Sequence, residues 1–416
     1  MRKLLWTMAV VAVLVSLHEL LWVLDPARYH LRFQTTGYNS HFQVNPTESF
    51  LAYTETMREK ISLARAKAAV NNSEQVVSYN SPRILLPDDH MCKKSSDNKY
   101  QNGILLIHGL LDSPYTMNVL GEELQKKCFL VYIVLLPGHG TVPGDLLDVT
   151  YKDWIAASRF SVNRLAEQAK NLYIMGYSLG GLLAINEVLH NPSRFKAMIL
   201  FAPALQLKTR YVFLIAPVYW LSHLIQPLQW LAFQEDNIPV RYESYTTNSA
   251  YQTLKMLQKV TEKLQHKKLD LPIFVQQSAD DMTVDAAGTL KLFRDNTNPH
   301  SVMLWYAENN DVDVYHDLRI KFINAALPAI KILDMAHLSY LMPSTDKFYG
   351  LHGEYRDCLI YSGHSKLWQQ CKMSGNNYLG EDTKDNLAKY LVQRLTFNPF
   401  YDGMIKELEG FLDNVG

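Results

Sequence analysis

The spacing of hydrophobic residues divides the chain near residue 104. From residue 25 to about residue 100 the chain is mostly polar, with one stretch, 46–69, in which apolar and aromatic side chains recur every three or four positions. Those side chains are Phe50, Tyr53, Met57, Ile61 and Ala64. The spacing predicts a helix with one apolar stripe that packs against another element. Asn45 before Pro46 predicts where this helix starts.

Beyond residue 104, short and continuous apolar runs alternate with amphipathic segments. The runs lie at 104–107, 130–134, 172–175, 198–201 and 273–275. Uninterrupted apolar runs bounded by turns are typical of parallel strands that are covered on both faces. Segments such as 154–169 and 182–190 have the helical spacing expected between such strands. The pattern predicts an α/β fold, with a mostly parallel, doubly wound sheet flanked by helices.

The interval 204–271 interrupts this alternation. It contains an aromatic-rich apolar stretch at 213–233, and then a second helical pattern. The apolar positions of that second pattern are Leu254, Leu257, Val260 and Leu264. One interpretation is that both segments are ordinary core helices. We favour a helical cap over the sheet at about 204–270, because long insertions at the carboxyl ends of strands usually shape a ligand site.

The first residues of the chain have the composition of a targeting segment. A basic pair precedes a largely apolar segment, 4–24, with His18 and Glu19 inside it. Its length matches the ~20 residues that span a bilayer as a helix. The stretch 4–17 also has the length of a signal-peptide core, but no small-x-small cleavage site follows it. We therefore favour an uncleaved signal anchor, with the chain after Asp25 exported to the periplasmic or extracellular face. Cleavage, the alternative, would make the protein secreted.

Composition excludes several classes of protein. The chain has 416 residues with 41 Lys and Arg against 41 Asp and Glu, so it lacks the positive charge with which proteins bind nucleic acid. A hydrophobic content of 48% excludes a mainly disordered chain. We divide the chain into an anchor at 1–24, an N-terminal extension at 25–100, a core domain at 101–350 and a C-terminal extension at 351–416.

The 4 cysteines are an even number, which is compatible with an oxidising compartment. Cys358 and Cys371 share a polar segment rich in tyrosine and glycine and are the expected disulfide pair. Cys128, just before an apolar run, is explained by burial alone. The cysteine spacing matches no metal-binding motif and no phosphate-cradling glycine loop occurs, so we expect no cofactor.

The strongest chemical signal is the pentapeptide Gly176-Tyr177-Ser178-Leu179-Gly180, a Gly-x-Ser-x-Gly pattern. It directly follows the predicted strand at 172–175 and directly precedes a predicted helix. Small residues two positions before and after the serine let the chain make a tight strand-to-helix turn that exposes the hydroxyl. A glycine-rich turn that merely packs a helix on a sheet is the alternative. Its place between strand and helix favours Ser178 as a nucleophile.

A nucleophilic serine also needs N–H donors for the developing oxyanion, each worth about 3 to 4 kcal/mol in favourable cases. The segment 108–113 follows the predicted strand at 104–107, where such a loop is expected. We predict that the backbone N–H groups of Leu110 and Leu179 are the two donors. His108 is then structural, with its tautomer set by a loop hydrogen bond.

The acid of such a site should follow the next main strand. The run 273–275 leads into two adjacent carboxylates, Asp280 and Asp281. Adjacent side chains point in different directions, so only one of the two can orient a histidine. We favour Asp281, which stands three residues before Val284, a valine suited to re-enter the core. Asp280 is the alternative.

The base is harder to choose because the chain has 14 histidines. In this architecture the histidine follows the acid, on a loop after the last strand. A short apolar run at 332–333 leads to His337, whereas His316 lies in a charged segment. We predict that His337 takes the proton of Ser178 and returns it to the leaving group, while Asp281 holds the imidazole tautomer.

These motifs resemble those of the α/β-hydrolase superfamily. Residues 103–345 contain four strings that look like its lysophospholipase, monoacylglycerol lipase and serine aminopeptidase-like branch. They are His108-Gly-Leu-Leu-Asp-Ser-Pro114, Pro137-Gly-His-Gly140, the Ser178 pentapeptide and the His337 loop. The resemblance implies an α/β-hydrolase fold and a serine hydrolase whose cap lies between the sixth and seventh strands. The segment 296–330 is longer than expected between the acid and the histidine.

We therefore expect a membrane-anchored, exported serine hydrolase that cleaves lipid-like carboxylic esters through an acyl-enzyme, of the lysophospholipase, monoacylglycerol lipase or carboxylesterase type. Its partners would be the acyl ester and, through residues 4–24, a membrane. The first alternative is a serine aminopeptidase-like amide hydrolase, which would need a carboxylate near the cap such as Glu235 or Asp236. Thioesterase or acyltransferase activity would use the same site residues. A non-catalytic protein that binds a lipid or partner at the cap would need none of them.

Overall fold

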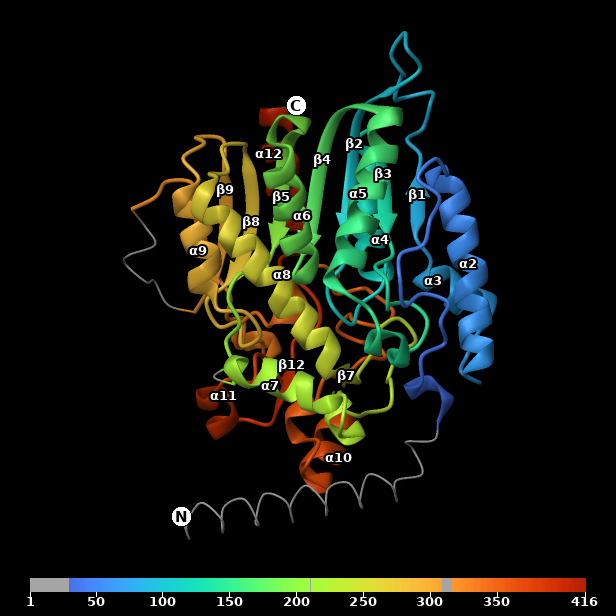
Figure 1. Cartoon of the computed structure of the whole chain (residues 1–416). Helices are drawn as coiled ribbons and strands as arrows, with labels where there is room; N and C mark the ends of the chain where they lie inside the picture. The colour runs from blue at the N-terminus through green and yellow to red at the C-terminus, as the bar shows by residue number, and fades with distance from the viewer. Residues whose placement is uncertain (1–29, 210, 309–315) are drawn as a thin grey trace, which may run out of the picture.

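The computed structural model describes residues 30–209, 211–308 and 316–416 (Figure 1). Its centre is an eight-stranded sheet in the order β1-β3-β2-β4-β5-β8-β9-β10. Strand β1 runs antiparallel to β3, and all the other neighbouring pairs are parallel. The strands are β1 (Arg83–Leu85), β2 (Tyr100–Ile107), β3 (Phe129–Val134), β4 (Ala169–Tyr177), β5 (Phe195–Phe201), β8 (Ile273–Ser278), β9 (Val302–Ala307) and β10 (Ile320–Asn324).

Each of the five predicted apolar runs lies within one strand of this sheet. Every residue of β3 and of β8 is buried, as expected for strands covered on both faces. Strands β9 and β10 account for the length of the segment 296–330, because this segment adds two strands to the sheet instead of forming one long loop. The mostly parallel α/β sheet predicted from the sequence is therefore present.

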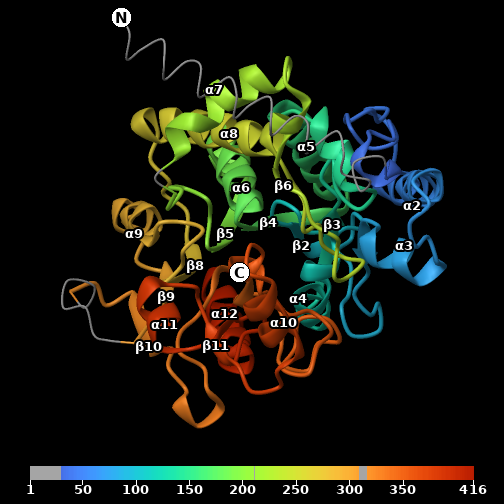
Figure 2. The same ribbon diagram turned by 90° about the horizontal axis from the view of Figure 1, so that it is seen from below.

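Helices cover both faces of the sheet (Figure 2). Helices α5 (Tyr151–Gln168) and α6 (Leu179–His190) lie on one face, with α9 (Ala286–Asp295) beside β8; α4 (Tyr115–Lys126) and α12 (Tyr401–Val415) lie on the other. Helix α6 is mostly apolar and is buried at every residue except His190. It can be buried all round because the sheet, α5 and α8 (Thr247–His266) enclose it.

The predicted N-terminal helix is α2 (Phe50–Lys67), which is followed by α3 (Glu74–Asn80). All five predicted stripe residues of α2 are buried, and Phe50 stacks on Tyr132 of β3 at a ring distance of 4.1 Å. The predicted start was wrong. Asn45 instead accepts the N–H of Glu48 in a turn, and the helix begins after Ser49, whose hydroxyl accepts the N–H of Ala52 at 3.1 Å.

The interval 204–270 contains α7 (Val212–Ser222), a ribbon of β6 (Trp230–Ala232) and β7 (Tyr245–Thr246), and α8. Helix α7 lies beyond the carboxyl ends of the strands, where a cap is expected (Figure 1). Within α7 only Ser222 is buried. Helix α8 packs on both α7 and α6, with Met256 and Val260 fully buried. The interval is thus a cap at α7, whereas α8 is in part a core helix.

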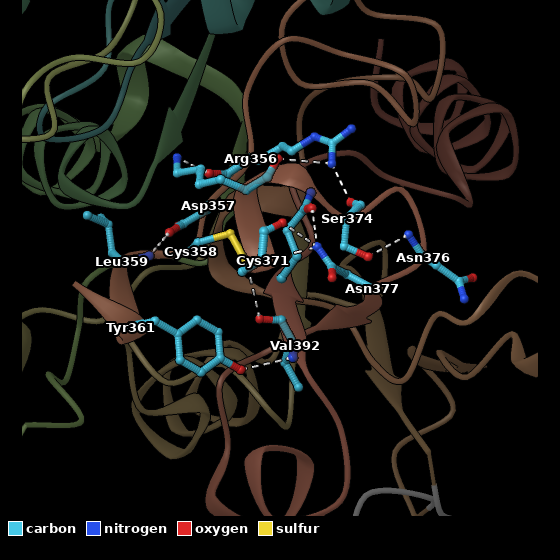
Figure 3. Close-up of a disulfide and its surroundings, with 12 residues drawn as sticks. Arg356, Asp357, Cys358, Leu359, Tyr361, Cys371, Ser374, Asn376, Asn377 and Val392 are labelled. Carbon is cyan, nitrogen blue, oxygen red and sulfur yellow. Dashed lines mark hydrogen bonds between the residues drawn. A yellow bond between two sulfur atoms is a disulfide. The ribbon is translucent and has the colours of Figure 1, made fainter. Parts of the chain in front are cut away.

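The C-terminal extension adds a two-stranded parallel ribbon, β11 (Tyr378–Gly380) and β12 (Val392–Arg394), and the short helices α10 (Ser365–Met373) and α11 (Lys384–Lys389). Cys358 and Cys371 form the expected disulfide here (Figure 3). A second disulfide joins Cys92 to Cys128, so burial alone does not explain Cys128. The loop before β2 and the end of α4 meet there, with a Cα–Cα distance of 5.3 Å that suits a disulfide.

None of the helices in the described part of the chain is long and apolar enough to cross a membrane. The predicted anchor at 4–24 lies outside the described residues. Anchor and cleaved signal peptide therefore both stay predictions.

Candidate active site

Ser178 lies at a sharp turn between β4 and α6. Its backbone has φ 53° and ψ −113°, a conformation that residues other than glycine rarely adopt. The Ser178 N–H donates to Phe201 O at 3.0 Å, which fixes the turn against β5. A Cβ at Gly176 would lie 2.1 Å from Gly180 O, and a Cβ at Gly180 would lie 2.1 Å from Ile107 O. Backbone segments approach so closely that both positions require glycine.

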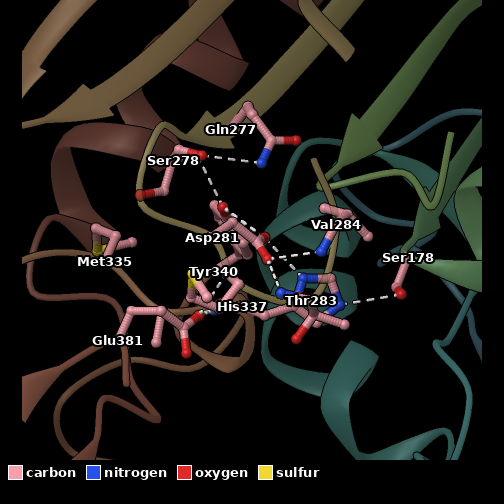
Figure 4. Close-up of polar contacts among 12 residues, drawn as sticks. Ser178, Gln277, Ser278, Asp281, Thr283, Val284, Met335, His337, Tyr340 and Glu381 are labelled. Atoms are coloured by element: carbon pink, nitrogen blue, oxygen red, sulfur yellow. Dashed lines mark hydrogen bonds and ion pairs between the residues drawn. The ribbon is translucent and has the colours of Figure 1, made fainter. Parts of the chain in front are cut away.

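The structure brings the three residues predicted for catalysis into one hydrogen-bonded chain (Figure 4). Ser178 Oγ lies 3.0 Å from His337 Nε2, and His337 Nδ1 lies 2.8 Å from Asp281 Oδ2. Asp281 is fully buried and His337 is 5% exposed. Because an ionised carboxylate only accepts hydrogen bonds, the imidazole hydrogen is assigned to Nδ1, which leaves Nε2 free to accept the serine proton.

The second carboxylate oxygen of Asp281 fixes the orientation of the acid. Oδ1 accepts the backbone N–H groups of Thr283 and Val284, both at 2.9 Å. The Tyr340 hydroxyl accepts the N–H of Ser278 at 2.8 Å and lies 3.3 Å from Asp281 Oδ2. Asp280 is not hydrogen-bonded to His337 in the described structure. Burial raises the pKa of Asp280, and its Oδ2 makes no hydrogen bond to another described residue.

The two predicted oxyanion donors come from the turn after β4 and the loop after β2. Leu179 is the first residue of α6, where N–H groups have no partner within the helix. Leu110 follows β2, and the contact between Gly180 and the end of β2 brings its loop beside the start of α6. The structure thus brings both residues to the same edge of the sheet as Ser178.

Two buried histidines hold the loop that contains Leu110. His108 Nε2 accepts the N–H of Leu136, and His139 Nε2 accepts the N–H of Leu111, both at 3.1 Å. Burial lowers the pKa of His139 to about 4 and the pKa of His108 well below its usual value of 6.5. Both rings are therefore neutral near neutral pH. His108 Nδ1 donates to Gly109 O at 2.8 Å, so a loop hydrogen bond sets its tautomer.

An ion pair that was not predicted from the sequence joins this loop to the cap. Arg241 Nη1 lies 2.5 Å from Asp112 Oδ1, and both side chains are largely buried. Burial raises the pKa of Asp112, and the Arg241 guanidinium partly opposes this rise. The N–H of the next residue, Tyr242, donates to Leu111 O at 2.9 Å. No local pattern signals a pair whose members are 129 positions apart.

A carboxylate of the C-terminal extension was also missed. Glu381 is fully buried, and its Oε2 accepts the backbone N–H of His337 at 3.0 Å (Figure 4). Arg394 Nε lies 2.6 Å from Glu381 Oε1. Although burial raises the pKa of Glu381, the Arg394 guanidinium lowers it to about 2. Glu381 is therefore an anion next to the backbone of the candidate base.

Ser178 lies at the turn from a central parallel strand into a buried helix, which is the position of the nucleophile in α/β-hydrolases. The mostly parallel eight-stranded sheet is also of the α/β-hydrolase class. Residues 98–318 match the family model described as serine aminopeptidase, S33. The chain therefore belongs to this family of α/β-hydrolases, as the resemblance implied. The matched segment includes Ser178 and Asp281 but ends before His337 and Glu381.

Individual relatives share only parts of the chain. A thermostable monoacylglycerol lipase of Bacillus sp. (strain H-257) is 32% identical over 90 residues, which span 22% of this chain and 36% of that lipase. A solved structure from work on two metagenome-derived lipolytic enzymes, LipS and LipT, has a TM-score of 0.46 and 20% identity over 55% of this chain and 87% of its own. The monoacylglycerol lipase of Paleococcus ferrophilus has a TM-score of 0.43 and 18% identity over 54% and 87% of the respective chains.

Proposed function

We propose that the protein is a serine hydrolase that cleaves carboxylic esters with a lipid-like acyl group. The observation that carries this proposal is the continuous hydrogen-bonded chain from Ser178 Oγ through His337 to Asp281. Such a chain activates a serine hydroxyl for attack on a carbonyl carbon. Membership of a hydrolase family and partial identity to a monoacylglycerol lipase support the same chemistry.

In this mechanism Ser178 Oγ attacks the ester carbonyl carbon while His337 Nε2 takes the hydroxyl proton. The N–H groups of Leu110 and Leu179 donate to the negative carbonyl oxygen of the tetrahedral intermediate. When the bond to the alcohol oxygen breaks, His337 returns the proton to that oxygen and the acyl group stays on Ser178. A water molecule, deprotonated by His337, then attacks the acyl carbon. The bond from this carbon to Ser178 Oγ breaks, His337 returns the proton to Oγ and the carboxylic acid leaves. Asp281 stabilises the imidazolium in both halves of the reaction.

The exposed apolar surface of α7 supports a lipid-like substrate. Phe213 is 70% and Trp220 64% exposed, in a helix whose apolar residues occur on all sides, and Leu224, just after the helix, is 84% exposed. Contiguous exposed apolar surface of this kind marks sites that contact an apolar phase or partner. We propose that this surface meets the acyl chains of the substrate or of the lipid layer that contains it.

The start of the described chain supports a membrane on the same side. Phe33 stacks on Phe233 of the cap at a ring distance of 3.9 Å, so the chain that follows the predicted anchor at 4–24 begins beside the cap. An anchor there would hold the cap close to the bilayer surface. An exported, membrane-anchored enzyme is accordingly our proposal for its location.

The amide-hydrolase alternative has less support from the cap. Asp236 is engaged by internal partners, with Arg32 Nη2 at 2.6 Å from its Oδ2 and the Glu243 N–H donating to its Oδ1 at 2.9 Å. Glu235 is exposed to solvent. The Asp236 carboxylate is therefore already paired with a cation of this chain, which makes it less suited to receive a substrate ammonium group, and the ester remains the favoured substrate.

The test is hydrolysis of p-nitrophenyl esters of increasing acyl length by the full chain, beside Ser178→Ala and His337→Ala. We expect activity that rises toward longer acyl chains and is lost in both variants. Aminoacyl p-nitroanilides form a second arm of the assay. Cleavage of the anilides alone would favour the aminopeptidase-like activity. Folded protein that cleaves neither series and does not react with a fluorophosphonate would favour a binding protein.

A further inference from the structure

We infer that Glu381 and Arg394 are positioning residues. They hold the loop that contains Asp281 (the acid loop) and the loop that contains His337 (the histidine loop) at a fixed distance from each other. The inference rests on the proposed function, because it assigns a role within the same site. Both residues lie in the C-terminal extension, beyond the part of the chain that matches the family model.

One carboxylate oxygen connects the two loops. Glu381 Oε2 accepts the N–H of His337 at 3.0 Å and the N–H of Met282, the residue after Asp281, at 3.2 Å. The residue after the candidate acid and the candidate base itself are thus hydrogen-bonded, through their backbone N–H groups, to the same atom. A shift of either loop would break one of these two hydrogen bonds.

Arg394 fixes this carboxylate and also contacts the acid loop itself. Its Nε and Nη2 lie 2.6 Å and 3.2 Å from Oε1 and Oε2 of Glu381, a forked pair that sets the plane of the carboxylate. Nη2 also donates to Thr283 Oγ1 at 3.1 Å, while Nη1 lies 3.5 Å from Asp357 Oδ2. The guanidinium lies among groups from three segments, and lysine could not reproduce this fork.

The ribbon of the extension places both side chains. Glu381 directly follows β11, and Arg394 is the last residue of the neighbouring strand β12. The N–H of Leu333, four residues before His337, donates to Leu379 O of β11 at 2.8 Å. The ribbon is therefore hydrogen-bonded to the chain that leads into the histidine loop.

The disulfide of the extension supports the other side of the ribbon (Figure 3). Cys358 is joined to Cys371, and the preceding residue, Asp357, accepts the N–H of Arg394 at 2.9 Å through its carbonyl. The Tyr361 hydroxyl accepts the N–H of Val392 at 3.0 Å. Covalent and hydrogen-bonded contacts thus reach from the disulfide to Arg394.

The expected consequence is catalytic, because the His337 ring must align with Ser178 and Asp281 at once. A displacement of about 1 Å in such a site can cost on the order of 10²-fold in rate. In Glu381→Gln the side-chain volume remains, but one oxygen and the negative charge are lost. We expect kcat to fall 10- to 100-fold, in the range of that estimate, with KM within about twofold of wild type. Arg394→Lys should behave alike, and the double variant should be no worse than the more severe single one.

A matched control separates positioning from stability. Glu187 is also buried and forms a forked pair with Arg159, at 2.8 Å for both contacts, between α6 and α5 and away from the two loops. Glu187→Gln should lower Tm about as much as Glu381→Gln and leave kcat within about twofold. If the two variants lower kcat and Tm alike, the pair at Glu381 is merely structural and the inference is wrong.

A second measurement needs no substrate. The Nδ1 proton of His337, hydrogen-bonded to Asp281, can be followed by proton NMR in the folded full chain. We expect its signal to shift and its exchange with water to accelerate in Glu381→Gln but not in Glu187→Gln. An unchanged signal in both variants would overturn the positioning role, even if wild type proved inactive toward every ester. Conversely, if the signal changes but the protein has no esterase activity, the positioning role stands and only the proposed function is contradicted.

Discussion

Ser178 and His337 are held in place by different means. Ser178 is positioned by the backbone, through a turn with φ 53°, two glycines in close backbone contact and a hydrogen bond to β5. His337 is positioned by side chains from distant segments, namely Asp281, Tyr177 through its hydroxyl at 2.7 Å from His337 O, and Glu381. The turn at Ser178, the serine side of the site, lies inside the segment that matches the family model. His337 and Glu381, on the histidine side, lie beyond that segment.

This difference indicates which parts of such a site can change. A backbone turn requires a short, local sequence, and any departure from it strains the chain. A side-chain clamp can be supplied by any segment that reaches the loop, so it can be replaced without altering the fold. The following experiments test the two sides of the site separately.

The largest expected effects are at the candidate nucleophile and the candidate base. Ser178→Ala and His337→Ala should each lower kcat on the order of 10⁶-fold, because nucleophile and base act as one unit. Ser178→Ala removes only one hydroxyl and should leave Tm close to that of wild type, whereas His337→Ala also leaves the buried Asp281 carboxylate without its ring partner and should lower Tm. Steady-state kinetics with a p-nitrophenyl ester and thermal unfolding check this pair. Retention of more than about a hundredth of the activity in folded Ser178→Ala would show that another residue is the nucleophile.

The acid should come next. Asp281→Asn should lower kcat on the order of 10⁴-fold, because the amide favours the wrong imidazole tautomer. Asp280→Asn is the matched control and should leave kcat within about threefold, since Asp280 is not hydrogen-bonded to His337. Equal losses in the two variants, measured on the same ester, would mean that the acid was assigned wrongly.

The two disulfides should differ in their effect on catalysis. Loss of either one removes on the order of 3 kcal/mol from the free energy of unfolding. Cys358→Ser with Cys371→Ser should in addition lower kcat several-fold, because this disulfide supports the ribbon that carries Arg394. Cys92→Ser with Cys128→Ser should affect only stability. The comparison is made by urea unfolding and by kcat of the two double variants. A larger loss of kcat in the variant without Cys92 and Cys128 would argue against the positioning role of Glu381 and Arg394.

As pH falls, His139, which holds the loop after β2, should bind a proton before the pair of Glu381 and Arg394 is disrupted. His139 binds a proton near pH 6.5 when unfolded but only near pH 4 when folded, because burial lowers its pKa to about 4. The unfolded state therefore binds more protons in this window. The free energy of unfolding should then fall by roughly 1 kcal/mol per pH unit as pH drops from 6.5 to 4. The pair of Glu381 and Arg394 stays charged there, since the pKa of Glu381 is about 2.

His139→Gln isolates this effect, because the glutamine carbonyl can still accept the N–H of Leu111. Burial raises the pKa of Asp334 to about 7, which acts in the opposite direction, so the slope is measured as the difference between wild type and variant. Urea unfolding at a series of pH values should give a flatter acid slope in His139→Gln. Identical slopes would contradict the assignment of His139 as a buried neutral group.

The sequence predicted the parts of the molecule that depend on local patterns. The five apolar runs, the stripe of α2 and the Ser178 turn each follow from residues close together in the chain. Strand β9 has a similar apolar run and was overlooked, whereas β10 is partly exposed and has no such run. The pairs of Arg394 with Glu381 and Cys92 with Cys128 depend on how distant segments meet, which no spacing rule describes.

All the roles proposed for this site depend on Ser178 being the nucleophile of a hydrolase. The most direct measurement is labelling of the full chain with a fluorophosphonate, followed by mass spectrometry to identify the modified residue. If Ser178 is the nucleophile, we expect one adduct per chain, on Ser178, formed at a rate that falls sharply in His337→Ala. Folded protein that is not labelled, or is labelled at another residue with Ser178 unmodified, would contradict this role.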